Sequence, residues 1–347
     1  MLQGLDVVYC NLILYFLGLW HVFENIVENI LCPSSNTNDD IDLSGKTAVI
    51  TGCNRGLGKA LCFELCKRGC HVILVCRDPA GAHKVAEEVS QLIPVCGTLG
   101  TCEVVYSDLS RLATVKACVK ALKGLLKSRK VNFLICNAGI MAPKHLNITY
   151  DGYELQFQVN FLSHVYLAHG VLKQSLVADD GKVVFVSSFA HWGASGNISE
   201  CFRCLDRYNG KLQYCNTKFF DVLIARELQK RILQGYYQHN YASIACLSVN
   251  PGVVNTKMAR EFCINEFPTC LNGIIAAIFG VLYSVTLRKP EKAACLILQA
   301  LQHQNSSTYI SRGPFGSWTP PHLPSKKISE GISAELWDVL RQDGWLL

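Results

Sequence analysis

From Lys46 onward, short runs of β-branched and apolar residues alternate with stretches of helical periodicity. The expected strands are 46–52, 71–77, 101–108, 131–139, 181–188 and 242–252, and the helices between them are 57–69, 81–92, 112–128, 151–176 and 214–233. Strands alternating with helices of this length predict right-handed βαβ crossovers and a mostly parallel sheet. We therefore expect an α/β fold of the Rossmann type, a doubly wound parallel sheet with ligands bound beyond the carboxyl ends of its strands.

The first 45 residues differ from the rest of the chain. Residues 7–23 contain no formal charge, and apolar residues continue to Leu31. A spanning helix needs roughly 20 apolar residues, so 1–31 is predicted to be a hydrophobic membrane anchor, spanning or interfacial. A soluble helix packed on the domain is the alternative. No basic n-region or small-residue cleavage site indicates a removable signal peptide. The polar, turn-rich residues 32–45 are expected to link this segment to one catalytic domain, 46–347.

Composition argues against two classes of function. The net charge of +6 is spread along the chain without a basic block, so nucleic-acid binding is not expected. The chain has 18 cysteines but is long for a disulfide-stabilised secreted domain. Because many cysteines stand where small apolar residues would serve, we expect buried, reduced thiols. Cys201 and Cys204 lack a second pair at zinc spacing, so no metal site is predicted.

Residues at the ends of the first three strands indicate a dinucleotide site. Gly52, Gly56 and Gly58 in TGCNRGLGKA allow a tight turn and close approach of the backbone to a pyrophosphate. NAD sites usually have an acidic residue after the second strand, but VCRD has Arg77 there, and Arg55 lies in the glycine turn. Two guanidinium groups converging on a phosphate favour NADP(H) over NAD(H). Asp108, after the third strand, contacts the adenine amino group or caps a helix.

Tyr214 and Lys218 have the spacing that places two side chains on one face of a helix. Seven short motifs occur in order along the chain: the glycine turn (52–58), SDL (107–109), NAG (137–139), VNFLSH with Asn160, VVFVSS (183–188), YCNTK (214–218) and PGVVNT (251–256). In these motifs, residues 46–256 resemble the short-chain dehydrogenase/reductase family.

The resemblance implies roles for four catalytic residues. Tyr214 is the implied general acid/base at the substrate oxygen, and Lys218 favours its phenolate and holds the nicotinamide ribose. Ser188, rather than Ser187, is implied to bind the substrate oxygen. Asn160 is implied to hold a water of the proton relay, or alternatively it caps or kinks its helix. The implied cofactor-binding residues are Gly52, Asn54, Arg55, Gly56, Leu57, Gly58, Arg77, Asp108, Asn137, Ala138, Gly139, Tyr214, Lys218, Pro251, Gly252, Val254 and Thr256.

The segment between Ser188 and Tyr214 is long, and it resembles the corresponding loop of the retinol-dehydrogenase-like branch of the family. The hydrophobic N-terminus and the KPEKAA helix also resemble that branch. The resemblance implies a lipophilic alcohol, aldehyde or ketone of the retinoid, steroid or polyprenoid type. We expect residues 189–213 and 257–347 to form the substrate region. The apolar run 271–285 is a core helix, a substrate lid or a second membrane-docking surface.

Two other functions stay open at this point. The first is a cofactor-binding regulator with the same fold and weak catalysis, and the second is a soluble reductase of small carbonyls. We expect a membrane-associated protein of the endoplasmic reticulum or lipid droplets whose domain faces the cytosol. Its three sequons, at Asn147, Asn197 and Asn305, are then not glycosylated. A homodimer is a further expectation from the family.

Overall fold

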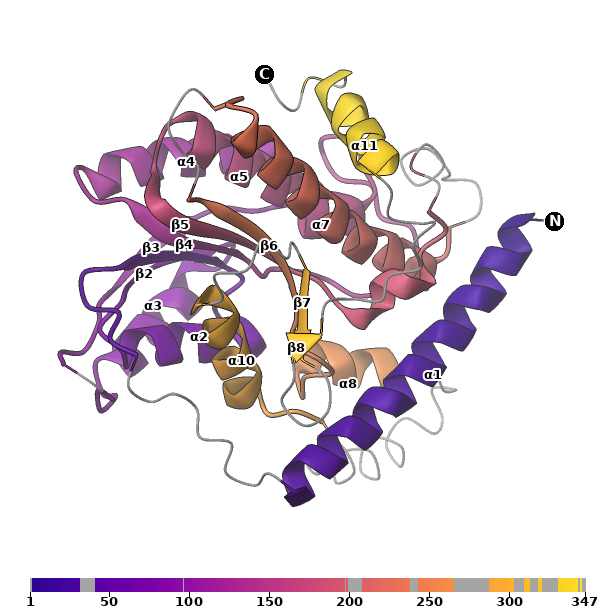
Figure 1. Cartoon of the computed structure of the whole chain (residues 1–347), viewed down its shortest axis with the longest axis horizontal. Helices are drawn as coiled ribbons and strands as arrows, with labels where there is room; N and C mark the ends of the chain where they lie inside the picture. The colour runs from indigo at the N-terminus through magenta and orange to yellow at the C-terminus, as the bar shows by residue number, and fades with distance from the viewer. Residues whose placement is uncertain are drawn as a thin grey trace.

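One eight-stranded sheet forms the centre of the protein, in the order β3-β2-β1-β4-β5-β6-β7-β8 (Figure 1). The computed structural model describes residues 2–31, 41–95, 97–196, 198, 208–237, 243–264, 287–302, 309–312, 318–319, 330–342 and 344. The strands are β1 (Thr47–Thr51), β2 (His71–Cys76), β3 (Cys102–Tyr106), β4 (Val131–Cys136), β5 (Val177–Val186), β6 (Ala245–Asn250), β7 (Tyr309–Arg312) and β8 (Trp318–Thr319). Seven strands are parallel and only β8 runs antiparallel, so the predicted Rossmann-type fold is confirmed.

Helices cover both faces of this sheet. They are α1 (Leu2–Leu31), α2 (Gly56–Cys66), α3 (Pro79–Val89), α4 (Leu112–Leu126), α5 (Ser163–Lys173), α7 (Gly210–Leu233), α8 (Lys257–Ile264), α10 (Pro290–Gln302) and α11 (Glu330–Gln342), with short helices η1 (Phe157–Leu162) and η2 (Phe189–Gly193). Figure 1 shows α2, α3 and α10 on one face of the sheet and α4, α5 and α7 on the other.

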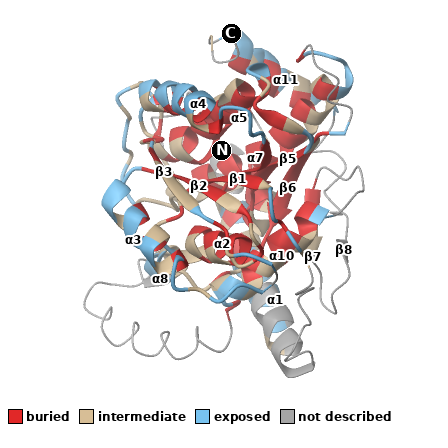
Figure 2. Ribbon diagram, turned by 90° about the vertical axis from the view of Figure 1, so that its left-hand side faces the viewer, coloured by how far each residue is buried: buried red, intermediate tan, exposed pale blue. Residues whose placement is uncertain are grey.

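The strands are apolar because each faces a helix layer on both sides. Every residue of β1, TAVIT, is buried, and the buried residues form one hydrophobic cluster on each face. Figure 2 shows this buried centre beneath exposed helix surfaces. Apolar side chains cover both faces of the sheet. The predicted site residues, many of them polar, lie instead at the carboxyl ends of the strands.

The predicted strands and helices are confirmed with small shifts, apart from the helix expected over 151–176. There the chain forms the π-helical η1 before α5 begins at Ser163. Asn160 lies in η1, and its side chain hydrogen-bonds the backbone of Ile140 outside this segment. These bonds stabilise the wider π-helical turn. Strand β5 begins at Val177, before the predicted residue 181, because it pairs with β4 there. Sequence periodicity missed β7, β8 and α11, whose chain segments are short or follow weak patterns.

The described cysteines confirm the prediction of reduced, buried thiols. All twelve are free, and ten of them are buried. On α2 and β3, Cys62, Cys66 and Cys102 bring their Sγ atoms within 4.8 Å of one another. The Cys62–Cys102 and Cys66–Cys102 Sγ distances are 3.6 Å, which is the contact distance of packed thiols in an apolar layer. Cys201 and Cys204 lie outside the described residues, as does the apolar run 271–285.

The N-terminal segment forms one long helix, α1, which lies against the catalytic domain (Figure 1). Among the described residues, no helix combines the length and the apolar character needed to cross a membrane. One side of α1 packs on η2 and α7 and buries Cys10 and Leu14. The other side is exposed and carries Leu12, Phe16 and Phe23. A helix packed on the domain was the alternative prediction for residues 1–31, and the contacts of α1 with η2 and α7 accord with such packing.

Candidate active site

One large cavity opens at the carboxyl ends of the parallel strands and has a volume of about 1190 Å³. Its wall includes every predicted cofactor residue, together with Ser188, Tyr214 and Lys218. Of the predicted site residues only Asn160 does not line it. Segments far apart in the sequence meet here because parallel strands end at one edge of the sheet.

The glycine turn between β1 and α2 presents its backbone to this cavity. Gly52 has a positive φ of 69°, and a Cβ atom at Gly58 would lie 2.3 Å from the Gly52 carbonyl oxygen. Only glycine fits these two positions. Arg55 is the N-cap of α2 and makes no side-chain cap, so the first N–H groups of the helix remain available to an anion. Asn54 adds a buried Oδ1 atom without a partner among the described residues.

Positive side chains lie where β2 ends. Arg55 and Arg77 are both exposed at the cavity wall, and neither pairs with a carboxylate in the described part of the chain. The neighbouring carboxylate of Asp78 accepts a hydrogen bond from Gly81 N (3.2 Å) and so caps α3. Asp108 also lines the cavity, and its Oδ1 accepts from Ser110 N (3.0 Å). Asp108 does not cap α4, because the N-cap of that helix is Arg111.

Tyr214 and Lys218 lie one turn apart on α7, as predicted, with both side chains buried at the cavity wall. Lys218 Nζ is 5.9 Å from the centre of the Tyr214 ring and donates hydrogen bonds to Val186 O (2.8 Å) and Asp221 Oδ2 (3.0 Å). Burial raises the pKa of Tyr214, while the Lys218 ammonium and a hydrogen bond with Ser188 act to lower it. Burial acts to lower the pKa of Lys218, but the Asp221 carboxylate, Tyr214 and Cys136 together outweigh it, so the pKa is raised.

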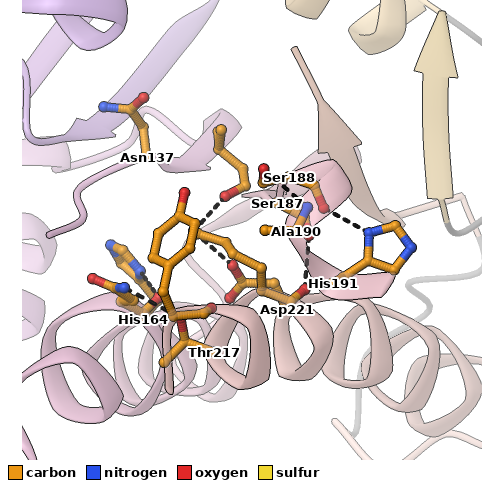
Figure 3. Close-up of polar contacts among 12 residues, drawn as sticks. Asn137, His164, Ser187, Ser188, Ala190, His191, Thr217 and Asp221 are labelled. Atoms are coloured by element: carbon orange, nitrogen blue, oxygen red, sulfur yellow. Dashed lines mark hydrogen bonds and ion pairs between the residues drawn. The ribbon is translucent and has the colours of Figure 1, made fainter. Parts of the chain in front are cut away.

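The two serines after β5 have different partners (Figure 3). Ser187 Oγ donates to the main-chain oxygen of Lys218 (2.7 Å), so it fixes α7 against the sheet. Ser188 Oγ accepts a long bond from Ala190 N (3.3 Å) and faces the cavity beside Tyr214, with which it shares a hydrogen bond. Both serines line the cavity, so the choice of Ser188 over Ser187 as the residue next to the substrate oxygen stays a prediction.

Asn160 belongs to a buried network behind the cavity. Its Nδ2 donates to Ile140 O (2.9 Å) and Thr217 Oγ1 (3.2 Å), and its Oδ1 accepts from Ile140 N (2.8 Å). Its carbonyl bonds His164 Nδ1 (2.8 Å), and His164 Nε2 reaches Thr51 Oγ1 (2.9 Å). This arrangement accords with the alternative in which Asn160 kinks its helix, and the water-holding role stays a prediction.

The turn after β6 is held by a residue that the motifs did not reveal. Arg288 is buried, and its Nη1 donates to Pro251 O (2.7 Å). Its backbone also bonds Val253 and Asn255. A Cβ atom at Gly252 would lie 2.4 Å from this guanidinium. Thr256 Oγ1 accepts from Ala259 N (3.3 Å), so this side chain caps α8 at the cavity wall.

Comparison with known proteins identifies the family of this chain. Residues 46–266 match the family model described as short chain dehydrogenase. The chain belongs to the short-chain dehydrogenase family. Human retinol dehydrogenase 13 is 30% identical over 274 residues, 79% of this chain and 75% of the relative. Human retinol dehydrogenase 11 is 29% identical over 86% of each chain. The relatives place the protein in the retinol-dehydrogenase-like branch, as the motifs predicted, and make it an oxidoreductase acting on CH–OH groups.

Solved structures share the fold of this short-chain dehydrogenase. A putative uncharacterized protein from Mycobacterium paratuberculosis is 27% identical, with a TM-score of 0.59 over 87% of this chain and 94% of that chain. The NADPH-bound carbonyl reductase from chicken fatty liver is 20% identical, with a TM-score of 0.53 over 80% of this chain and 100% of that chain.

The motifs did not mark the apolar part of the cavity wall, although Phe189 and Phe262 lie in the ranges expected to form the substrate region. The N-terminal helix contributes Leu14, Tyr15, Gly18 and Leu19, and the loops and helices opposite it contribute Met141, Leu155, Val159, Phe189 and Phe262. No motif marks these residues, since an apolar side chain at a cavity wall has the same sequence signature as one in the core. For α1, the only available signal was the unusually apolar face of the helix.

Proposed function

We propose that this short-chain dehydrogenase uses NADP(H) to interconvert a lipophilic alcohol and its carbonyl compound, with Tyr214 as the general acid/base. The observation that carries the proposal is a single cavity that joins the glycine turn at one end to Tyr214 and Ser188 at the other. A dinucleotide lying along this cavity would reach from one to the other. When bound, it would supply or accept the hydride.

The residues at the glycine turn fit a dinucleotide phosphate. The close approach at Gly58, the uncapped start of α2 and the buried, unpartnered Oδ1 of Asn54 form a polar cradle that no described side chain fills. Arg55 and Arg77 supply two charges at the end of β2, where the extra phosphate of NADP(H) would bind. Because Asp78 caps α3, its carboxylate is engaged and does not argue for NAD(H).

In the proposed reaction, the catalytic side chains bind the substrate oxygen and transfer the proton. In carbonyl reduction, the hydroxyls of Ser188 and Tyr214 donate hydrogen bonds to the carbonyl oxygen, and Tyr214 Oη gives its proton to that oxygen as it becomes a hydroxyl. In alcohol oxidation, Tyr214 Oη takes the proton back. The Lys218 ammonium lowers the cost of the intervening phenolate.

The apolar wall supports a lipophilic substrate. Leu14 and Leu19 of α1 face the cavity together with Met141, Val159 and Phe262. Burial of apolar surface is worth about 25 cal/mol per Å², so a long hydrocarbon gains affinity here, while a small polar carbonyl gains little. This accords with a retinoid, steroid or polyprenoid, and the retinol dehydrogenases among the relatives point the same way.

The exposed face of α1 supports membrane association. Leu12, Phe16 and Phe23 are exposed, and Leu19, which is also exposed, lines the substrate cavity. A helix lying in the membrane interface on this face would place the cavity mouth at the lipid surface. We propose this interfacial arrangement on the endoplasmic reticulum or lipid droplets, with the domain in the cytosol.

A substrate screen with the full-length protein tests the function. NADPH oxidation is followed with retinal, a steroid ketone, a polyprenal and a small aldehyde as substrates, in lipid vesicles. We expect turnover with at least one lipid carbonyl and a loss of about 100-fold or more in Tyr214→Phe. Tyr150→Phe, at an exposed tyrosine, should keep full activity. NADPH binding without turnover on any carbonyl would favour the regulator, and turnover of only the small aldehyde would favour the soluble reductase.

A further inference from the structure

The helix that carries Tyr214 and Lys218 also carries a buried carboxylate that the mechanism above does not use. Asp221 lies one turn beyond Lys218, and its relative exposure is 2%. Its Oδ2 atom accepts a hydrogen bond from Lys218 Nζ at 3.0 Å, and the two form an ion pair. Figure 3 shows the Asp221 side chain below Ser187 and Ser188. Oδ1 has no partner in the described part of the chain. A half-satisfied buried carboxylate costs stability, so a structural role alone explains it poorly.

The ion pair limits what the Lys218 ammonium can do. An ammonium has three N–H donors. Val186 O and Asp221 Oδ2 take two of them, at 2.8 and 3.0 Å. One donor is left for the cavity, and its direction is set by the other two. Without Asp221, the flexible lysine chain has only one protein anchor and samples more positions.

The pair also sets the charge that Tyr214 experiences. The Lys218 ammonium favours the phenolate, and the Asp221 carboxylate opposes it. Since a salt-bridged pair has no net charge, its effect on a neighbouring phenol is smaller than that of an isolated ammonium. Burial, the largest influence on the pKa of Tyr214, favours the neutral phenol as well.

We infer that Asp221 is a positioning residue of the proposed reaction: it anchors the Lys218 ammonium and offsets its charge, so that Tyr214 keeps its proton at neutral pH. Tyr214 then enters carbonyl reduction ready to donate that proton. This inference rests on the proposed function, in which Tyr214 is the proton donor. It adds a residue outside the cavity wall, since Asp221 acts through Lys218 and does not line the cavity.

Other titratable groups packed around the pair contribute little charge. Burial raises the pKa of Cys136 on β4, Cys215 on α7 and Cys246 on β6, so these thiols are neutral. Burial lowers the pKa of His164 on α5 to about 4, so its imidazole is neutral too. Cys10 on α1 has a pKa lowered by its hydrogen bond with Cys215, on the side of α7 where α1 packs. The carboxylate that acts directly on Lys218 and Tyr214 is therefore Asp221.

The direct test measures the ionisation of Tyr214 without substrate. The near-ultraviolet absorbance of tyrosinate is titrated in the wild type, in Tyr214→Phe and in Asp221→Asn, and the Tyr214→Phe curve is subtracted to isolate Tyr214. We expect Asp221→Asn to move the Tyr214 midpoint by about one pH unit toward acid. Glu227→Gln is the matched control, because Glu227 is a buried carboxylate of the same helix that pairs with Arg231 instead. It should leave the midpoint in place.

A second pair of variants keeps the test informative if Asp221→Asn folds poorly. Lys218→Met and Lys218→Met/Asp221→Asn compare the protein with and without Asp221 in a background that has no ammonium to leave unpaired. The double variant should again titrate at lower pH than Lys218→Met alone. An unchanged or higher midpoint in both comparisons would overturn the inference.

Steady-state kinetics separate this inference from the proposed function. If the wild type reduces a lipid carbonyl, Asp221→Asn should move the alkaline limb of its pH profile toward acid and lower kcat more than it raises KM. A wild type without turnover would contradict the proposed function while leaving the absorbance titration interpretable. Normal turnover with an unshifted pH profile in Asp221→Asn would contradict only the role of Asp221.

Discussion

The Sγ atom of Cys10 on α1 lies 3.4 Å from the Sγ atom of Cys215 on α7, and both thiols are buried. Cys215 directly follows Tyr214, so this contact joins the N-terminal helix to the helix that carries the catalytic pair. It sits beside the cavity wall formed by Leu14 and Leu19. The N-terminal segment is thus part of the active-site architecture.

Mild oxidation should convert this contact into a covalent link. A thiol oxidant such as diamide takes two electrons and two protons from Cys10 and Cys215 and leaves a disulfide, because the two sulfurs need to approach by only a small distance. Mass spectrometry of a proteolytic digest should find the linked peptides in the wild type and not in Cys10→Ser. A wild type that never forms this link while other thiols react would contradict the docking of α1.

Removing the arginines at the end of β2 should weaken NADPH binding more than NADH binding. Each charge-assisted contact to the extra phosphate is worth about 1.5–3 kcal/mol, so Arg55→Ala or Arg77→Ala should raise the Kd for NADPH about tenfold or more. The Kd values are measured by cofactor fluorescence for both nucleotides. Lys123→Ala, at an exposed lysine of α4, is the control and should change neither. Equal losses for NADPH and NADH would show that the arginines do not read the extra phosphate.

The stability of the protein should fall in mild acid. Burial lowers the pKa of both His164 and His191 to about 4. A histidine with a lowered pKa binds fewer protons in the folded state, so the free energy of unfolding falls as the pH drops from about 6.5 to about 4. The loss is on the order of 3 kcal/mol per histidine across this window. Urea denaturation at several pH values measures it.

A single substitution separates this effect from general acid sensitivity. His191→Asn should reduce the slope of unfolding free energy against pH in the same window, whereas His83→Asn, at an exposed histidine, should leave the slope unchanged. Identical slopes in all three proteins would mean that His191 binds protons equally in the folded and unfolded states, which would contradict its lowered pKa.

Charge on the outer face of α1 should release the protein from membranes. Leu12 and Phe16 are 64% and 69% exposed and do not line the cavity. Replacing both with aspartate places two charges in the proposed lipid interface, so binding to liposomes in a flotation assay should be lost. Ile93→Asp changes an apolar residue of the catalytic domain that is 83% exposed, and this variant should float like the wild type. Flotation of the Leu12/Phe16 variant would contradict interfacial binding through this face.

The sequence alone determined the sheet and the places where its chemistry would lie. Alternating strand and helix patterns predicted a mostly parallel sheet, a glycine turn after β1 predicted a dinucleotide site, and the spacing of Tyr214 and Lys218 placed them on one helical face. These are local signals: each depends on spacing within one turn or one helix. For this reason Gly52 and Arg77 could be predicted as cofactor contacts from their positions, whereas the roles of Tyr214 as proton donor and of Ser188 came from the resemblance to the family.

The groups that act on those residues from distant parts of the chain could be identified only from the three-dimensional structure. Arg288 reaches the Pro251 turn from 37 positions along the chain, and α1 places Leu14 at the cavity wall. No sequence motif marked Asp221. In the structure it is buried in an ion pair with Lys218 and contributes to the pKa of Tyr214. Burial and electrostatic coupling depend on distances in space and on the exclusion of water, and neither has a signature in residue spacing.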